Sequence, residues 1–191
     1  MTTIAVVRKN GIAAIAADSL TKWGSAKESA TYIANHEKIL QVGDSQIAIT
    51  GSATFKLILR DYFSGGGEFR LSSAADIFRT WNRLHVALKE RYFVLPEEDK
   101  DDSLESSRLE VLIANPYGIF GVSGHRTVQE FSRFYAYGTG SDYALGALYS
   151  SYDEPAHSAE TLARHAIEAA AEFDDCTGLP LTCATVRLLQ A

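Results

Sequence analysis

The stretch TTIAVVRKNGIAAIAADS, residues 2–19, decides the fold class of this chain. It contains two runs of β-branched and small apolar residues, separated by Asn10-Gly11. Asn-Gly between two such runs is a strong signal for a tight hairpin turn. The alanines of the second run indicate a strand that is crowded on both faces, as in the middle of a sandwich. We therefore expect a β-hairpin with strands at 2–9 and 12–17.

The remaining sequence groups its expected strands and helices into blocks. TKWGSAKESA, residues 21–30, is polar and is predicted to be a loop. Further strands are predicted within 31–42, 46–51, 108–116, 118–123, 127–138 and 181–189. Helices are predicted at 52–63, from Ser73 to about Leu88, shortly after Gly138-Thr139-Gly140-Ser141, and at 158–173. The second helix carries an amphipathic stripe of apolar residues spaced by three and four, which we interpret as core packing.

The order of these elements is strands, two helices, strands, two helices and a strand. Such runs imply segregated layers rather than alternating βαβ units. Two helical pairs need two sheet faces to cover. We therefore expect an α+β fold, a four-layer α-β-β-α sandwich that forms a single domain over residues 1–191.

Composition excludes several classes of partner. The net charge is −6 and no polybasic cluster is present, which argues against nucleic acid. No apolar run approaches the ~20 residues that span a bilayer, and no signal peptide is apparent. We expect a cytoplasmic protein without a membrane partner. The acidic segment 96–107 is expected to be a solvated loop, with a metal-binding or docking loop as the minority reading.

Two cysteines, Cys176 and Cys183, are too few for a disulfide framework. Reduced thiols are the expected state, and a redox clip between them stays open. The sequence also lacks a nucleophile elbow, a His/Cys cluster with metal spacing and a phosphate-binding loop. Thr2 remains as the candidate for chemistry. Removal of Met1 before this small residue would leave Thr2 with a free α-amine, whose pKa of ~7.7–8.0 suits a base.

Five segments together resemble proteasome β-type subunits, of the bacterial kind related to the protease partner of the HslU ATPase. They are TTIAVVRKNGIAAIAADS, YIANHEKIL, AITGSA, YGTGSDYALG and HAIEAAAEFDDCTG, and they run nearly from end to end of the chain. The resemblance implies the N-terminal-nucleophile hydrolase fold, which is the same four-layer sandwich.

The resemblance also implies roles for individual residues. Thr2 would be the nucleophile, with its freed amine as proton acceptor. Lys38 would lower the pKa of the Thr2 groups, and Asp18 would hold Lys38 in place. Gly51 would supply the backbone N–H that stabilises the oxyanion.

Three more residues match the family positions around the terminal threonine. Asp174 matches the acid that orients it. Thr139 and Thr177 stand where the family usually has serine, and both keep a hydroxyl able to bond the α-amine. The family pattern differs in two further places: Ser52 follows the oxyanion glycine where a second glycine is frequent, and the loop from Asp18 to Lys38 is longer.

By the same pattern, four residues are predicted to bind the substrate residue that precedes the cleaved bond. Residues two apart in a strand share a face, so His36 and Leu40 would flank Lys38. Ile49 and Ala53 would complete the pocket. We expect this pocket to be mostly apolar with one titratable edge, and therefore to prefer apolar residues.

The sequence thus predicts a threonine-type endopeptidase that acts on peptides or unfolded proteins without a metal or organic cofactor. The resemblance implies a homo-oligomeric double ring of heptameric or hexameric rings, and an ATPase unfoldase partner by analogy alone. Two alternatives stay open. One is a non-proteolytic amidase with the same nucleophile, and the other is a catalytically silent ring scaffold, against which the presence of both Thr2 and Lys38 counts.

Overall fold

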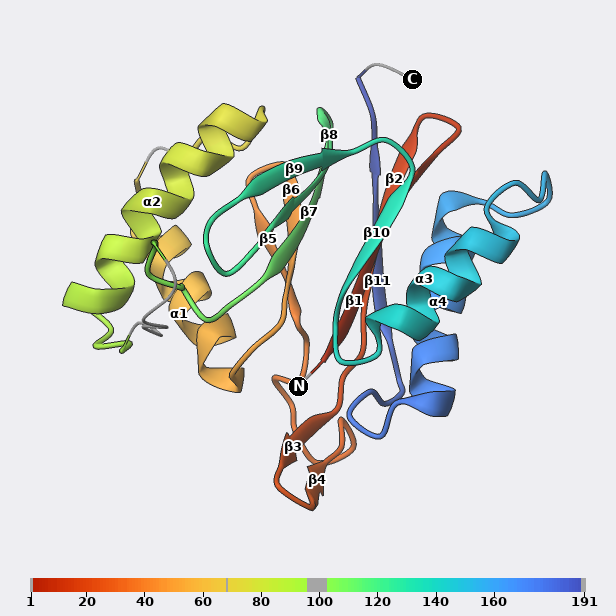
Figure 1. The fold of residues 1–191 in the computed structure, drawn as a ribbon, viewed down its shortest axis with the longest axis horizontal. Coiled ribbons are helices and arrows are strands. Elements are labelled where there is room, and N and C mark those ends of the chain that lie inside the picture. The colour runs from red at the N-terminus through yellow and green to blue at the C-terminus, as the bar shows by residue number, and fades with distance from the viewer. Residues whose placement is uncertain (1, 68, 96–102, 190–191) are drawn as a thin grey trace.

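Two antiparallel sheets pack face to face between two layers of helices in the computed structural model, which describes residues 2–67, 69–95 and 103–189 (Figure 1). The first sheet has the strand order β10-β1-β2-β11. Its strands are β1 (Thr3–Lys9), β2 (Ile12–Ala17), β10 (Phe134–Gly138) and β11 (Thr182–Arg187). The second sheet has the order β5-β6-β7-β8-β9. Its strands are β5 (Ile39–Val42), β6 (Ser45–Ile49), β7 (Val111–Asn115), β8 (Gly118–Val122) and β9 (Val128–Phe131).

The β1-β2 hairpin predicted from the opening stretch forms the centre of the first sheet. Asn10 and Gly11 both have positive φ, +51° and +74°, as the two-residue turn of a twisted hairpin requires. Side chains then alternate between two cores. Ile4 and Ile15 point into the space between the sheets, whereas Ala5 and Ala16 face the helices. The hairpin is therefore buried on both faces, as predicted.

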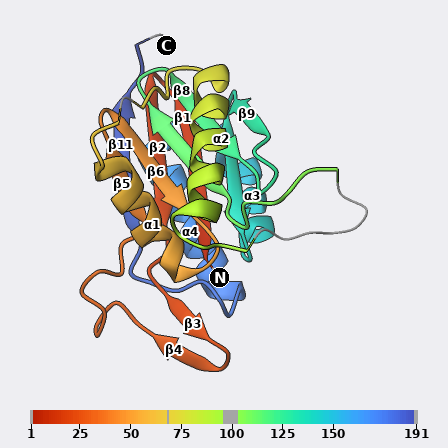
Figure 2. The same ribbon diagram turned by 90° about the vertical axis from the view of Figure 1, so that its left-hand side faces the viewer.

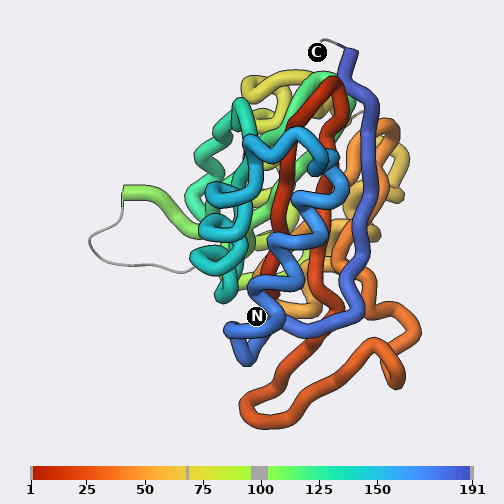
Figure 3. Tube along the Cα trace, turned by 90° about the vertical axis from the view of Figure 1, so that its right-hand side faces the viewer, coloured from red at the N-terminus to blue at the C-terminus, as the bar shows by residue number. Residues whose placement is uncertain are grey.

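Helices α3 (Ser141–Ser151) and α4 (Ala159–Phe173) cover the first sheet (Figure 3). Helices α1 (Ala53–Ser64) and α2 (Ala74–Glu90) cover the second (Figure 2). The predicted stripe of α2 is buried against the second sheet, with Trp81 at 1% exposure. These layers confirm the four-layer α-β-β-α sandwich. In the part of the chain that the structure describes, no helix has the length and apolarity to cross a membrane.

Ser73 and Ser158 begin their helices as predicted. The Ser73 hydroxyl accepts the Asp76 N–H, and the Ser158 hydroxyl accepts the Thr161 N–H. Each bond satisfies one of the backbone donors that a helix leaves without an internal partner.

The predicted loop at 21–30 is wrong, because this segment forms a hairpin of β3 (Thr21–Trp23) and β4 (Ala26–Glu28). Its strands have three residues each and are largely exposed, so no alternation of apolar and polar residues marks them. The hairpin extends beyond the ends of both sheets, on the side where the N-terminus lies (Figures 1 and 2).

Two predicted strands have different bounds. Only 39–42 of the segment 31–42 is strand, so residues 31–38 reach the sheet as irregular chain. The segment 127–138 contains two strands in different sheets, since the chain crosses between β9 and β10 at Ser132-Arg133. Neither residue is a glycine or proline, so the sequence does not mark this crossing. The expected acidic loop falls largely on 96–102, outside the described residues.

We predict that Leu112→Ala, which empties space between the two sheets, lowers the free energy of unfolding by about 2–5 kcal/mol. Leu112 is fully buried in the inter-sheet cluster. Leu57→Ala is the matched control, because Leu57 is 50% exposed on α1 and should change stability by only about 0.5 kcal/mol. Urea denaturation followed by circular dichroism measures both. Equal shifts for the two variants would contradict the burial assigned to Leu112.

Candidate active site

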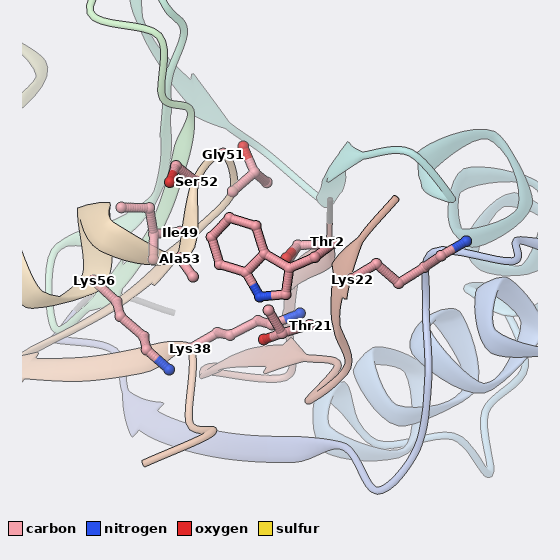
Figure 4. Close-up of a pocket in the computed structure, with 11 residues that line it drawn as sticks. Thr2, Thr21, Lys22, Lys38, Ile49, Gly51, Ser52, Ala53 and Lys56 are labelled. Atoms are coloured by element: carbon pink, nitrogen blue, oxygen red, sulfur yellow. The ribbon is translucent and has the colours of Figure 1, made fainter. Parts of the chain in front are cut away.

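A pocket of about 90 Å³ lies where β1 begins, between the first sheet, the end of β6 and the start of α1 (Figure 4). Thr2 lines this pocket and is 4% exposed. The predicted residues Lys38, Ile49, Gly51 and Ala53 line it with Thr2. Residues far apart in the sequence are thus brought to one hollow by the packing of the two sheets.

Asp18 directly follows β2 and is fully buried beside the pocket. Its Oδ1 accepts hydrogen bonds from Lys38 Nζ (2.7 Å) and the Thr3 N–H (3.1 Å). Its Oδ2 accepts the N–H groups of Leu20 and Gly178, both at 3.1 Å. Four donors fill the acceptor capacity of an ionised carboxylate. Asp18 is therefore held in one orientation and holds Lys38 in turn.

Lys38 Nζ also donates to the Leu20 carbonyl oxygen at 2.6 Å, and the residue is 7% exposed. Burial lowers the pKa of Lys38, while the charge of Asp18 opposes this lowering. Burial raises the pKa of Asp18, while Lys38 and the backbone N–H groups of Thr3 and Gly178 oppose it. Each charge thus offsets the burial of the other, and the two side chains form a buried ion pair.

A chain of hydroxyl groups connects the end of α4 to β1. Thr139 Oγ1 and Thr177 Oγ1 both donate to Asp174 Oδ2, at 2.7 and 2.5 Å. Because the Thr177 proton is used in this bond, the 2.6 Å contact between Thr3 Oγ1 and Thr177 Oγ1 must have Thr3 as donor. Thr3 Oγ1 accepts the Gly140 N–H at 3.0 Å. The structure therefore brings Thr139, Asp174 and Thr177 together, next to the residue that follows Thr2.

Gly138 and Gly140, on either side of Thr139, lie in close contact with Thr2 and Thr3. A Cβ at Gly138, whose φ is +103°, would lie 1.8 Å from the Thr2 carbonyl oxygen. A Cβ at Gly140 would lie 2.6 Å from Thr3 Oγ1. The Thr139 N–H donates to the Thr2 carbonyl oxygen at 3.1 Å. Gly138, Gly140 and Thr3 were missed in the sequence analysis, although the spacing of glycines on both sides of Thr139 was a usable signal.

Gly51 lines the pocket in a conformation that requires glycine. Its φ is +100°, and an added Cβ would lie 3.0 Å from the Arg108 carbonyl oxygen and 3.2 Å from the Phe55 ring. A side chain at this position would be strained whatever its chemistry.

The other predicted pocket residues divide into two groups. Ile49 and Ala53 line the pocket, whereas His36 and Leu40 do not. Strand β5 begins only at Ile39, so the expected alternation from 36 to 40 does not hold. His36 Nδ1 contacts the Ile33 carbonyl oxygen at 2.9 Å, and Leu40 packs in the core beneath the helices α1 and α2.

The lining carries more positive charge than the expected pocket with one titratable edge. Three lysines line it, namely Lys22, Lys38 and Lys56, and no acidic side chain is among its described lining residues. Lys22 and Trp23 come from the β3-β4 hairpin that the sequence analysis took as a loop. Three lysines therefore line the pocket beside its apolar residues, where one titratable edge was expected.

The two cysteines and the acids beside Cys176 were the remaining candidates for redox or metal chemistry near this site. No disulfide joins Cys176 and Cys183, so the open redox clip is not formed. Ligand atoms of Asp174, Asp175 and Cys176 lie within 4.8 Å of one another. Hydrogen bonds already engage them, from the two threonines to Asp174 and from Cys176 Sγ to Asp175 at 2.9 Å. We assign no metal there.

Comparisons with solved structures place the fold. Thiobacillus denitrificans BPH is 60% identical with a TM-score of 0.95, and the match covers 100% of both chains. BPH in complex with epoxomicin is 61% identical with a TM-score of 0.92, over 98% of this chain and 99% of that one. Eukaryotic HslV from Trypanosoma brucei shares the fold at 19% identity, with a TM-score of 0.72 over 97% and 99%. No protein-family profile and no curated protein matches the chain.

The chain has the N-terminal-nucleophile hydrolase fold, which is the fold of the proteasome and HslV neighbours. The chain belongs to the proteasome/HslV-like family, and its 60% identity to BPH relates it to that bacterial proteasome homologue.

We predict that Gly138→Ala destabilises the protein by about 1–3 kcal/mol, because the added Cβ collides with the Thr2 carbonyl and strains the backbone. Gly146→Ala in helix α3 is the matched control, since an added Cβ there meets nothing within 4 Å. This control should leave stability unchanged or raise it by about 0.5–1 kcal/mol. Urea denaturation midpoints measure both variants. A neutral Gly138→Ala would show that the Thr2 backbone is not clamped by β10.

Proposed function

We propose that this chain is a threonine-type endopeptidase in which Thr2 attacks peptide bonds with its own α-amine as base. The observation that carries the proposal is the buried Lys38–Asp18 ion pair, whose lysine lines one pocket with Thr2. Stability alone does not account for this pair, because a buried ion pair rarely makes a protein more stable than apolar packing at the same place would. The same location serves a nucleophile, whose groups a nearby ammonium makes easier to deprotonate.

The reaction requires that Met1, which lies outside the described residues, is removed. The freed Thr2 amine then takes the proton of the Thr2 hydroxyl, and the hydroxyl oxygen attacks the peptide carbonyl. An ammonium has three N–H donors, and the bonds to Asp18 and Leu20 use two of those of Lys38. The third is available to the Thr2 side.

Two further parts of the site fit this chemistry. Gly51 borders the pocket, so its backbone N–H is the proposed donor to the tetrahedral oxyanion. The leaving amine is released with the proton that the α-amine carried. Water activated by the same amine hydrolyses the ester on Thr2. We assign Thr139, Asp174 and Thr177 to the orientation of the terminal amine, through the hydroxyl chain that ends at Thr3.

We further propose a homo-oligomeric double ring that encloses these sites and admits peptides or unfolded chains. Family resemblance supports the ring, and it supports an ATPase unfoldase partner by analogy alone. BPH has been solved in complex with epoxomicin, and at 61% identity this chain is expected to bind the same compound.

We predict that the purified chain lacks Met1 and that epoxomicin increases its mass. Thr2→Ala should lose Met1 as well, because alanine is also small, but should not gain mass with epoxomicin. Intact-mass spectrometry before and after treatment measures both properties. Retained methionine would overturn the α-amine mechanism. A silent scaffold would show neither a mass increase nor peptide hydrolysis, and an amidase would show the mass increase without hydrolysis of peptides.

We predict a bell-shaped dependence of kcat/KM on pH. Activity should rise as the Thr2 amine loses its proton, near or below pH ~7.7–8.0. It should fall again as Lys38 loses its proton, at a pH below the ordinary 10.5 of lysine because burial lowers this pKa. Lys38→Met should reduce kcat/KM by about 100-fold or more, whereas Lys27→Met on the exposed strand β4 should not. A fully active Lys38→Met would refute the assigned role.

A further inference from the structure

The three lysines of the pocket differ in how their charges are compensated. Lys38 Nζ lies 2.7 Å from Asp18 Oδ1, and Lys22 Nζ lies 2.7 Å from Asp175 Oδ2. Among the described residues, no carboxylate lies within ion-pair distance of Lys56. Its Nζ donates instead to the Asn35 carbonyl oxygen at 2.5 Å. Lys56 is thus the pocket cation without an acidic partner in the described chain.

This cation is largely removed from water. Lys56 is 9% exposed, and its burial lowers its pKa, with the neighbouring charge of Arg60 acting in the same direction. The charge of Glu28 opposes this lowering of the pKa and is the smallest of the three contributions. A buried charge without a counter-ion is unfavourable. A carboxylate that entered the pocket would supply the missing counter-charge.

The position of Lys56 suits such a contact. It lies three residues after Ala53 on α1, so the two side chains share one helix face. Figure 4 shows Lys56 extending from that helix toward the backbone end of the Lys38 side chain, whose own ammonium points the other way, toward Thr2. One of the three N–H donors of its ammonium is used by Asn35, which leaves two for a carboxylate.

The start of helix α1 adds to the positive potential. Ser52 is its N-cap and, with Ala53, lines the pocket. The N-terminus of a helix carries a partial positive charge that favours anions. No acidic residue lies in the first turn of α1 to cancel it. Lys56 and the N-terminus of α1 therefore both add positive potential to the pocket.

We propose that Lys56 makes this pocket selective for substrates with an acidic residue, Asp or Glu, immediately before the cleaved bond. This inference deepens the proposed peptidase function and rests on it. It replaces the apolar preference that the sequence led us to expect.

The test compares four fluorogenic peptides that differ only in the residue before the cleaved bond, which is Glu, Gln, Leu or Lys. With the wild-type protein, kcat/KM for the Glu peptide should exceed that for the Gln peptide by ~10-fold or more, as for a hydrogen bond between charged groups. Lys56→Met should remove this difference. Lys56→Glu should invert the preference toward the Lys peptide, and Lys27→Met should match the wild type.

A binding measurement separates this inference from the peptidase proposal. Trp23 lines the pocket and is 59% exposed, whereas Trp81 is 1% exposed in the core. Tryptophan fluorescence of Thr2→Ala should therefore report pocket occupancy by uncleaved, amide-capped peptides. The Glu peptide should bind ~10-fold more tightly than the Gln peptide in Thr2→Ala, and equally in the variant that also carries Lys56→Met.

The outcomes distinguish the two proposals. Cleavage of all four peptides at equal rates would overturn the role of Lys56 and leave the peptidase function standing. Absence of cleavage with selective binding of the Glu peptide would overturn the peptidase function and support Lys56. Absence of both would overturn both.

Discussion

The buried ion pair between Asp18 and Lys38 is the interaction on which the site depends. Asp18 joins four donors from four separate segments: the start of β1, the turn after β2, the chain before β5 and the loop before β11. Losing either charge would leave the other buried without compensation, at a cost of about 3–5 kcal/mol. The carboxylate is therefore a structural crosslink of the site as well as an electrostatic partner of the lysine.

The four-layer architecture explains how this ion pair is buried from solvent. Sheet-to-sheet packing fills the interior with Ile4, Ile15 and Leu112, and the small residues of β1 and β2 let α4 lie close against the opposite face. The site is placed at the end of this packed interior rather than on a loop. Backbone hydrogen bonds then set its geometry. Gly138 and Gly140, where β10 ends and α3 begins, allow the chain to approach Thr2 closely, and the Thr139 N–H fixes the position of the Thr2 carbonyl oxygen.

Sequence reasoning reached the layer order and the hairpin, because long apolar periodicity and turn residues are local signals. The seven residues of the proposed catalytic group came from the resemblance to proteasome β-type subunits, and their roles stay a proposal. Sequence reasoning failed where the signal is not local. The β3-β4 hairpin is exposed and too short to show alternation, so Lys22 and Trp23 were not placed at the pocket. His36 and Leu40 do not line the described pocket, and the alternation expected from 36 to 40 is absent because strand pairing starts only at Ile39. The lack of a described carboxylate within ion-pair distance of Lys56 depends on the whole pocket, so no pattern within α1 could reveal it.

The register of the first hairpin has a consequence for how this family can change. Ile4 pairs with Ala17, so Thr3 and Asp18 end opposite strands at the same level. One inserted residue in either strand would turn its helix-facing alanines toward the other sheet and its isoleucines toward α4. The same insertion would move the Asp18 carboxylate away from the Lys38 ammonium that it binds. The length of this hairpin is thus constrained twice, by the hydrophobic core and by the proposed chemistry, and we expect length variation only in segments such as the β3-β4 hairpin that no layer encloses.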